Sequence, residues 1–313
     1  MVCNLDAARE AHTKLKGIAL RTPAIRLSCD SSHEVFLKLE NLQPIGSFKI
    51  RGAANAMLRA PRERIARGVL TASAGNMAQG VAWCARLLGV PATVVTPDTA
   101  PETKLRAVER LGGRIIKVPF EEWWRTFETR AFPGVDATFI HAFDDADVMA
   151  GNGTIGLELM EDLPELDAIV VPWGGGGLAC GIAAVVKALK PSVRVYAAES
   201  ETGAPLTASL AAGKPVVVDY RPSFVDGIAS KTVFPGMLEL AKQLLDGTIV
   251  VKLEDAAAAI RLVAERARVI CEGAAGCAVA AAVSRQAGRG RTVAIVSGGN
   301  IDLKKFCELC GSC

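Results

Sequence analysis

Apolar residues recur along this chain with two spacings, one typical of helices and one typical of strands. Residues 5–15 have the helical spacing, and residues 35–40 alternate as a half-buried strand does. After a predicted helix at residues 53–66, strands and helices alternate. The predicted strands are residues 68–72, 92–96, 114–118 and 138–141, and the helices between them are residues 78–88, 102–111 and 121–130. This alternation predicts a parallel sheet with helices on both faces.

A second series of the same kind fills the rest of the chain. Its predicted strands are residues 168–172, 193–197, 248–251 and 292–296, and its predicted helices are residues 154–160, 178–189, 254–269 and 276–283. We therefore predict an α/β fold of two lobes, each an open, mostly parallel sheet with helices on both faces. The larger lobe would comprise residues 1–60 and 146–313, and the smaller, inserted lobe would comprise residues 61–145.

Composition and charge narrow the class of protein. About half of the 313 residues are hydrophobic and the formal net charge is only +3, so there is no nucleic-acid or membrane footprint. No apolar run is long enough to cross a bilayer, and the first residues lack the apolar core of a secretory signal. We therefore expect a cytoplasmic protein.

The nine cysteines are consistent with that compartment, where most would be reduced thiols. Cys307, Cys310 and Cys313 form a Cys-x-x-Cys-x-x-Cys pattern, which could bind a metal or an iron–sulfur cluster. No fourth ligand lies nearby in the sequence, and chain ends fray. The pattern therefore favours a frayed, oxidation-prone tail over a metal site.

Lys49 stands in an unusual context, within Asn41-Leu-Gln-Pro-Ile-Gly-Ser-Phe-Lys-Ile-Arg-Gly52. A strand enters this stretch, Pro44 and Gly46 mark a turn, and a helix leaves it. Between Phe48 and Ile50 the amine would be partly desolvated, which lowers its pKa and favours Schiff-base chemistry. The alternative is a lysine that reaches solvent or pairs with Glu40.

A run of glycines, Gly174, Gly175, Gly176 and Gly177, lies between a predicted strand and a predicted helix that starts at Leu178. Backbone N–H groups without Cβ interference, together with the helix N-terminus, would form a cup for a phosphate group. The run is neither a P-loop nor the dinucleotide-binding pattern, because the spacing and the following residues differ. The alternative is a flexible turn.

Two further polar clusters follow strands. Ser73, Ala74, Gly75 and Asn76 precede a helix, and several N–H groups there would suit a carboxylate, while Asn76 could hold an aromatic oxygen. Ser297 follows the last strand and would present a neutral hydroxyl at the same sheet edge. The alternatives are an ordinary helix cap and a turn with a capping serine.

Together the lysine, the glycine cup, the amide and the hydroxyl match the needs of pyridoxal 5'-phosphate: an aldehyde partner, a phosphate anchor, and partners for the phenolic oxygen and the ring nitrogen. In these features the chain resembles the fold-type II pyridoxal-phosphate enzymes, which have the tryptophan synthase β-like architecture. It is most similar to the threonine/serine dehydratases, or ammonia-lyases, with serine racemase as near kin. The motifs that carry the resemblance occur in the family's order: Ser47-Phe-Lys-Ile-Arg-Gly52, Ser73-Ala-Gly-Asn-Met-Ala-Gln79, Gly174-Gly-Gly-Gly-Leu178 and Ser297-Gly-Gly-Asn300.

The resemblance implies a role for each matching position. Lys49 would form the Schiff base with the cofactor and then remove the substrate α-proton. The glycines would bind the phosphate, with Phe48 and Leu178 also at the cofactor. Asn76 would hold the phenolic oxygen, Ser297 would face the ring nitrogen, and residues 73–76 would line the substrate carboxylate site. Glu272 would lie near the cofactor; its alternative is a helix N-cap acid.

Three departures from the family pattern matter. Ala74 replaces a serine that racemases use as the base on the opposite face, so the sequence favours elimination over racemisation. Met77 replaces a usual histidine, so the pocket is expected to be less polar or packed differently. Glu199 matches one ligand of a divalent-cation site found in some relatives, but Pro205 occupies the position of the second ligand. We therefore expect the metal site to be absent or weak.

The expected activity is dehydration and deamination of a β-hydroxy amino acid, with L-threonine or L-serine as first substrates and a 2-oxo acid and ammonia as products. Alternatives are a bulkier substrate such as phenylserine or hydroxyaspartate, a serine racemase, a β-replacement synthase, and a non-catalytic phosphate-binding protein. By resemblance the protein would be a homo-oligomer that binds a small amino acid.

Overall fold

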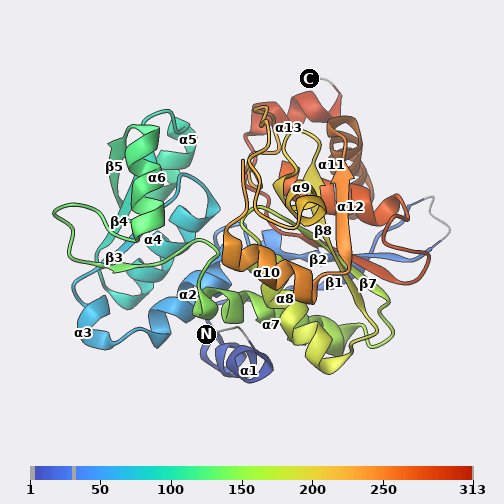
Figure 1. The fold of residues 1–313 in the computed structure, drawn as a ribbon, viewed down its shortest axis with the longest axis horizontal. Helices are drawn as coiled ribbons and strands as arrows, with labels where there is room; N and C mark the ends of the chain where they lie inside the picture. The colour runs from blue at the N-terminus through green and yellow to red at the C-terminus, as the bar shows by residue number, and fades with distance from the viewer. Residues whose placement is uncertain (1–3, 30–32, 312–313) are drawn as a thin grey trace.

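The strands form two separate sheets in the computed structural model, which describes residues 4–29 and 33–311. Figure 1 shows them on opposite sides of the molecule, with α2 and α7 running between them. The larger sheet has six strands in the order β1-β2-β10-β7-β8-β9, and only β1 runs antiparallel. Its strands are β1 Ala24–Arg26, β2 Val35–Leu39, β7 Ala168–Pro172, β8 Arg194–Ser200, β9 Gly247–Val251 and β10 Thr292–Val296.

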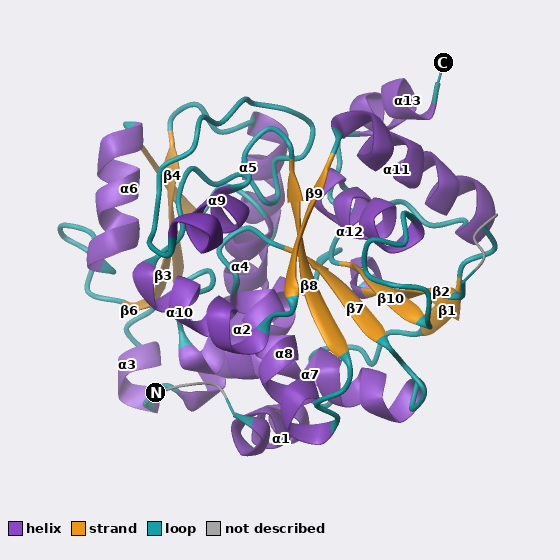
Figure 2. Ribbon diagram, turned by 45° about the vertical axis from the view of Figure 1, so that its right-hand side comes forward, coloured by secondary structure: helices purple, strands orange, loops and turns teal. Residues whose placement is uncertain are grey.

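The smaller sheet has four parallel strands in the order β5-β4-β3-β6. Its strands are β3 Val69–Ala72, β4 Ala92–Pro97, β5 Arg114–Val118 and β6 Thr138–Phe139. Helices α4 and α6 lie on either side of it, as Figure 2 shows in profile. The helices of this part are α3 Arg62–Ile65, α4 Asn76–Leu88, α5 Glu102–Arg110 and α6 Phe120–Thr129.

Alternation along the strands decides which face of the larger sheet each side chain covers. In β7, Ile169 and Val171 belong to the core shared with α7, α8 and α10, whereas Ala168 and Val170 pack with α11 and α12. Both faces are thus buried, as a parallel sheet requires. The helices of this part are α1 Leu5–Lys14, α2 Lys49–Arg59, α7 Ala146–Asp162, α8 Gly177–Leu189, α9 Pro205–Ala212, α10 Pro235–Leu244, α11 Leu253–Ala267, α12 Gly273–Val283 and α13 Leu303–Cys310, with a 3₁₀ turn, η1, at Glu40–Leu42.

The α/β prediction with two mostly parallel sheets is confirmed, and the lobe boundaries at residues 60/61 and 145/146 stay a prediction. Several element predictions were wrong. The helix expected at residues 53–66 is two helices, α2 and α3, because Pro61 interrupts it. The helix expected at residues 154–160 begins at Ala146, where the Asp145 side chain caps it by accepting from two backbone N–H groups.

The prediction of a frayed C-terminal tail was also wrong for the part of the tail that the structure describes. Residues 303–310 form α13, because Asp302 caps its first turn and Arg261 donates a hydrogen bond of 2.8 Å to the carbonyl oxygen of Leu309. Phe306 and Leu309 pack against the core beneath α11 and α12. Cys307 and Cys310 lie on this helix, whereas Cys313 lies outside the described residues.

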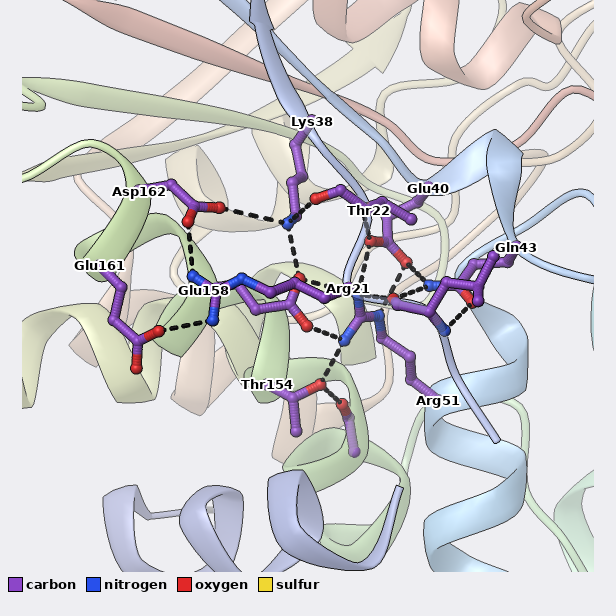
Figure 3. A network of polar contacts seen from close by, with 12 residues as sticks. Arg21, Thr22, Lys38, Glu40, Gln43, Arg51, Thr154, Glu158, Glu161 and Asp162 are labelled. Carbon is purple, nitrogen blue, oxygen red and sulfur yellow. Dashed lines mark hydrogen bonds and ion pairs between the residues drawn. The ribbon is translucent and has the colours of Figure 1, made fainter. Parts of the chain in front are cut away.

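A buried ionic cluster joins β2, η1, α2 and α7 (Figure 3). Arg51 donates to both oxygens of Glu40, at 2.8 Å each, and to both oxygens of Glu158, at 2.6 and 3.0 Å. Lys38 donates to Glu158 at 2.5 Å. Burial would raise the pKa of Glu40, but the charge and hydrogen bonds of Arg51 lower it below its usual value. The cluster therefore holds α2 in place at Arg51, which lies two residues after Lys49.

Candidate active site

Lys49 is the first residue of α2, and its amine points into the protein. Its Nζ donates a hydrogen bond of 2.7 Å to the carbonyl oxygen of Ala142 and lies 5.0 Å from the centre of the Phe48 ring. Burial lowers the pKa of Lys49 from 10.5 to about 8, although the charge of Glu272 raises it in part. The alternative pairing with Glu40 does not occur, because that carboxylate is bound by Arg51.

The carbonyl that accepts from Lys49 lies in a turn held by His141. The Nδ1 of His141 accepts from the backbone N–H groups of Phe143 and Asp144, at 3.2 and 2.8 Å. Burial lowers the pKa of His141 to about 3, and the charges of Arg130 and Lys49 add to this. The imidazole is therefore neutral and able to accept. Our sequence reasoning missed this turn, whose only signal was a polar residue at the end of a predicted strand.

The glycine run connects β7 to α8, as expected, and its backbone has no room for larger residues. Gly176 has a φ of +92°, and a Cβ there would meet the buried Trp173 ring. A Cβ on Gly175 would overlap the Phe143 ring, and one on Gly177 would lie 2.7 Å from the Cα of Phe143. The turn that holds Lys49 therefore also packs against the glycine run. The Leu178 side chain lies in the core, so only its backbone could contact a phosphate.

Asn76 begins α4, and its side chain reaches across to the larger sheet's loops. Its Nδ2 donates to both oxygens of Glu272, at 2.9 and 3.1 Å, and its Oδ1 accepts from the Nδ2 of Asn300 at 2.8 Å. Burial raises the pKa of Glu272 to about 7, against the effect of the Asn76 hydrogen bond. Glu272 is the N-cap residue of α12, but its side chain makes no capping hydrogen bond. It binds Asn76 instead, so the N-cap alternative does not account for this carboxylate.

Ser297 follows β10 and is buried. Its carbonyl oxygen accepts from the backbone N–H of Phe48 at 3.0 Å, and Ser47 bridges to Gly298. The turn before Lys49 is thus tied to the end of β10. Ser73, Ala74 and Gly75 lie in the partly exposed loop before Asn76, where the Ser73 hydroxyl accepts from the N–H of Gly75 at 3.2 Å.

The structure therefore brings Lys49, Asn76, Glu272 and the glycine run into one connected region. The link that sequence reasoning missed is residues 226–228: a Cβ on Gly174 would lie 3.3 Å from the Cα of Ile228, and one on Gly227 would lie 3.3 Å from Glu272. No direct contact joins Ser73 or Ala74 to the other site residues in the described interactions, apart from their place in the loop that leads to Asn76.

These residues fit pyridoxal 5'-phosphate. The glycine run lies at the N-terminus of α8, where a phosphate is favoured, and Cβ atoms at residues 175–177 would clash with Phe143 or Trp173. Lys49 supplies a buried amine of lowered pKa, and Asn76 supplies a neutral donor. The roles assigned to individual residues stay predictions.

Met77 and Glu199 mark the departures from the family pattern. Met77 is buried in the core between α2 and α4, where Ile50 and Val81 also lie, so its sulfur lies in an apolar environment. The carboxylate of Glu199 accepts from the N–H groups of Leu206 and Thr207, at 2.8 Å each, at the start of α9. Among the described residues, no group of three or more His, Cys, Asp or Glu side chains could hold a metal ion.

Comparison with known proteins places the chain in a family. The profile of the pyridoxal-phosphate dependent enzymes matches residues 15–298. An L-threonine ammonia-lyase of Thermotoga maritima is 42% identical over 305 residues, which cover 96% of this chain and 76% of that protein. A catabolic L-threonine dehydratase of Staphylococcus aureus is 37% identical over 97% of this chain and 91% of its own length. The solved structure of maize serine racemase has a TM-score of 0.90 at 32% identity, covering 98% of this chain and 97% of that one.

The two mostly parallel sheets and the comparisons define a fold-type II enzyme, and the chain belongs to the family of pyridoxal-phosphate dependent enzymes. The predicted family and cofactor are thereby confirmed. Within residues 4–29 and 33–311, no helix is long and apolar enough to cross a membrane.

Proposed function

We propose that this protein is a threonine ammonia-lyase, a carbon–nitrogen lyase that acts on L-threonine and L-serine. Water is eliminated across Cα and Cβ of the substrate, and water is taken up again when ammonia leaves, giving a 2-oxo acid. Two relatives that match nearly the whole chain, at 42% and 37% identity, are named an L-threonine ammonia-lyase and an L-threonine dehydratase.

The observation that carries the proposal is the state of the Lys49 amine. It is partly buried beside Phe48 and donates a hydrogen bond of 2.7 Å to the carbonyl oxygen of Ala142, and desolvation lowers its pKa to about 8. When bound, the cofactor would supply an aldehyde that holds the substrate amine and a ring that accepts electron density from Cα. Lys49 in its neutral form is then the base that takes the α-proton.

The other site residues would bind and orient the coenzyme and the substrate. The N–H groups of residues 174–177 would bind the phosphate, and the N–H groups of residues 73–76 would bind the substrate carboxylate at the start of α4. Asn76 would donate to the phenolic oxygen. Ser297 would face the ring nitrogen with a neutral hydroxyl, which does not stabilise a protonated ring as a carboxylate would, and so favours elimination over transamination.

The loop before Asn76 argues against a racemase. Racemisation needs a second acid–base group on the face of Cα opposite Lys49, and Ala74 offers only a methyl group at the position where racemases of this family carry a serine. Ser73 carries the hydroxyl group of this loop, and its oxygen accepts a hydrogen bond from the N–H of Gly75. We therefore expect loss of the β-hydroxyl to follow deprotonation.

A substrate panel tests the proposal. The purified protein with pyridoxal phosphate is given L-threonine, L-serine, phenylserine, hydroxyaspartate and D-serine, and ammonia, 2-oxo acid and the chirality of the remaining amino acid are measured. We expect equimolar ammonia and 2-oxobutanoate from L-threonine. Lys49→Ala should abolish both, whereas the exposed Lys252→Ala should change neither. Racemisation without ammonia release, or release only from phenylserine or hydroxyaspartate, would contradict the proposed activity.

We further propose a homo-oligomer in the cytoplasm. Both parts of this proposal rest on the resemblance to the threonine dehydratases. Light scattering coupled to size exclusion tests the first part: a mass at the monomer's 32.8 kDa would contradict it.

A further inference from the structure

Asn300, in the loop after β10, has no role in the activity proposed above, yet it makes two well-formed hydrogen bonds at the centre of the site. Its Nδ2 donates to the carbonyl oxygen of Ile45 at 2.9 Å and to the Oδ1 of Asn76 at 2.8 Å. Both bonds come from the same amide nitrogen, which has two hydrogens to give. Asn300 thus links the turn before Lys49 to the first residue of α4.

The direction of these bonds is fixed by chemistry. The carbonyl oxygen of Ile45 can only accept, so the NH₂ group of Asn300 must face it. The second hydrogen of that NH₂ group then meets the oxygen of Asn76, so the NH₂ group of Asn76 faces Glu272, with its Nδ2 at 2.9 and 3.1 Å from the two carboxylate oxygens. The main-chain carbonyl of Ile45 thus fixes the orientation of the Asn300 amide. Through Asn300, it favours the orientation in which Asn76 presents its NH₂ group to Glu272.

The surroundings keep Asn300 in place. A Cβ on Gly46 would lie 2.7 Å from the Oδ1 of Asn300, so the glycine with φ of +70° in the turn before Lys49 also leaves room for this amide. The backbone N–H of Asn300 contributes a hydrogen bond that lowers the pKa of Glu272, against the larger effect of burial. Asn300 therefore contacts both partners of the Asn76–Glu272 pair.

We propose that Asn300 is a positioning residue that locks the Asn76 amide with its NH₂ group, and not its oxygen, on the Glu272 side, where the coenzyme's phenolic oxygen would bind. A free amide can rotate by half a turn at little steric cost, which would put an acceptor where the anionic oxygen binds and repel it. Asn300 prevents that rotation. The inference rests on the coenzyme role of Asn76, but it does not depend on which amino acid is the substrate.

The first test replaces the donor by an acceptor of the same shape. In Asn300→Asp the new carboxylate can only accept, so Asn76 loses its donor, and its NH₂ group is drawn away from Glu272 and the coenzyme side toward residue 300. We expect the dissociation constant of pyridoxal phosphate, measured by titration of the coenzyme-free protein, to rise roughly 10-fold to 100-fold, as for a lost hydrogen bond to a charged group. The visible absorbance band of the bound coenzyme should shift, because its phenolic oxygen loses a donor.

Asn41→Asp is the matched control. Asn41 is partly exposed like Asn300, and its Nδ2 also donates to a main-chain carbonyl, that of Ile270 at 3.0 Å, close in sequence to Glu272. Among the described interactions, Asn41 makes none with Asn76. Asn41→Asp therefore adds the negative charge without rotating the Asn76 amide. We expect its coenzyme affinity within about twofold of the parent. Equal losses for Asn300→Asp and Asn41→Asp would overturn the proposal.

A double-mutant cycle separates positioning from a general structural effect. If Asn300 acts through the Asn76 amide, then Asn300→Ala and Asn300→Asp should weaken coenzyme binding in the parent but change it less than about twofold in an Asn76→Ala background. The same fold-loss in both backgrounds would overturn the proposal. Should Asn300→Ala not fold, the isosteric Asn300→Asp carries the cycle alone. Because no step uses a substrate, failure of the threonine assay leaves this result unaffected.

Discussion

At the scale of single residues, two buried groups have pKa values moved toward neutrality by the same cause. Burial lowers the pKa of Lys49 to about 8 and raises that of Glu272 to about 7, and the two are within electrostatic reach of each other. Groups that exchange protons near working pH are typical of catalytic sites. The shift at Lys49 sets the pH dependence of coenzyme attachment, and the shift at Glu272 sets a pH dependence of protein stability.

Lys49 should react with the coenzyme over an unusual pH range. Only the neutral amine attacks an aldehyde, so the rate of covalent attachment should rise with pH and level off near 8, whereas an ordinary lysine would level off near 10.5. Stopped-flow absorbance after mixing coenzyme-free protein with pyridoxal phosphate measures this rate. Because the charge of Glu272 raises the Lys49 pKa, Glu272→Gln should move the plateau to lower pH. A rate that still climbs well above pH 8 would show an unperturbed amine.

Glu272 should make the stability of the coenzyme-free protein depend on pH. Its pKa is raised from 4.5 to about 7, so between these values the folded protein binds more protons at this group than the unfolded chain does. The stabilisation is complete below pH 4.5 and is lost as pH rises through about 7. The full loss is ~3 kcal/mol. Denaturant unfolding from about pH 5 to about pH 8 should show the parent losing roughly that much more than Glu272→Gln; parallel curves would contradict the shift.

Much of the site could be predicted residue by residue because its chemistry is local. Lys49 and the glycine run each occupy a strand-to-helix junction, and that pattern is visible in the sequence. The parts that could not be predicted depend on contacts between distant segments. Ala142 O becomes the partner of Lys49 only because β6 delivers it there, and Asn300 meets Asn76 across 224 residues.

At the scale of elements, α2 owes its position to Arg51. The four charged side chains of the cluster are at most 2% exposed, so removing one leaves others buried without a partner. We expect Arg51→Met to lower the free energy of unfolding by about 3–5 kcal/mol.

Arg59→Met on the same helix is its control. Arg59 is 29% exposed and pairs with Glu10 and Asp147 at the surface, so its loss should cost less than about 1 kcal/mol. Urea unfolding measures both. Equal losses would mean that the cluster contributes no more than a surface ion pair.

The mispredicted elements have different causes. Gly151 and Gly153 precede the predicted start at residue 154 but lie inside α7, where a Cβ on Gly151 would strike the main chain of Arg51 and one on Gly153 would lie 2.9 Å from the carbonyl oxygen of Gly181. These glycines allow helices to approach closely, which a single sequence cannot distinguish from helix breaking. Helices α9, α10 and α13, and strand β1, were not predicted: β1 has three residues and α9 has no one-sided apolar pattern, whereas the amphipathic α10 and α13 were missed.

At the scale of the whole molecule, the site joins the parts built on the two sheets. Asn76 follows β3 of the smaller sheet, whereas Glu272, Asn300 and the glycine run belong to segments around the larger one. Lys104 of α5 also pairs with Asp226 at 2.5 Å, next to Gly227. A coenzyme bound here would contact both parts and so oppose unfolding of the whole chain.

The coenzyme should therefore stabilise the protein by mass action. At about 100 times its dissociation constant, it should add about 2.7 kcal/mol to the free energy of unfolding. At the same concentration Lys49→Ala, which lacks the covalent link, should gain less. Denaturant unfolding with and without pyridoxal phosphate measures both gains, and no gain for the parent would contradict a coenzyme site in this fold.

The most direct measurement concerns the amine itself. Borohydride reduction of the coenzyme-loaded protein fixes the coenzyme to the lysine that holds it, and peptide mass spectrometry then locates the modified residue. The account predicts one modified peptide, carrying the coenzyme on Lys49, and none in Lys49→Ala. Modification of a different lysine, with Lys49 unmodified, would contradict it.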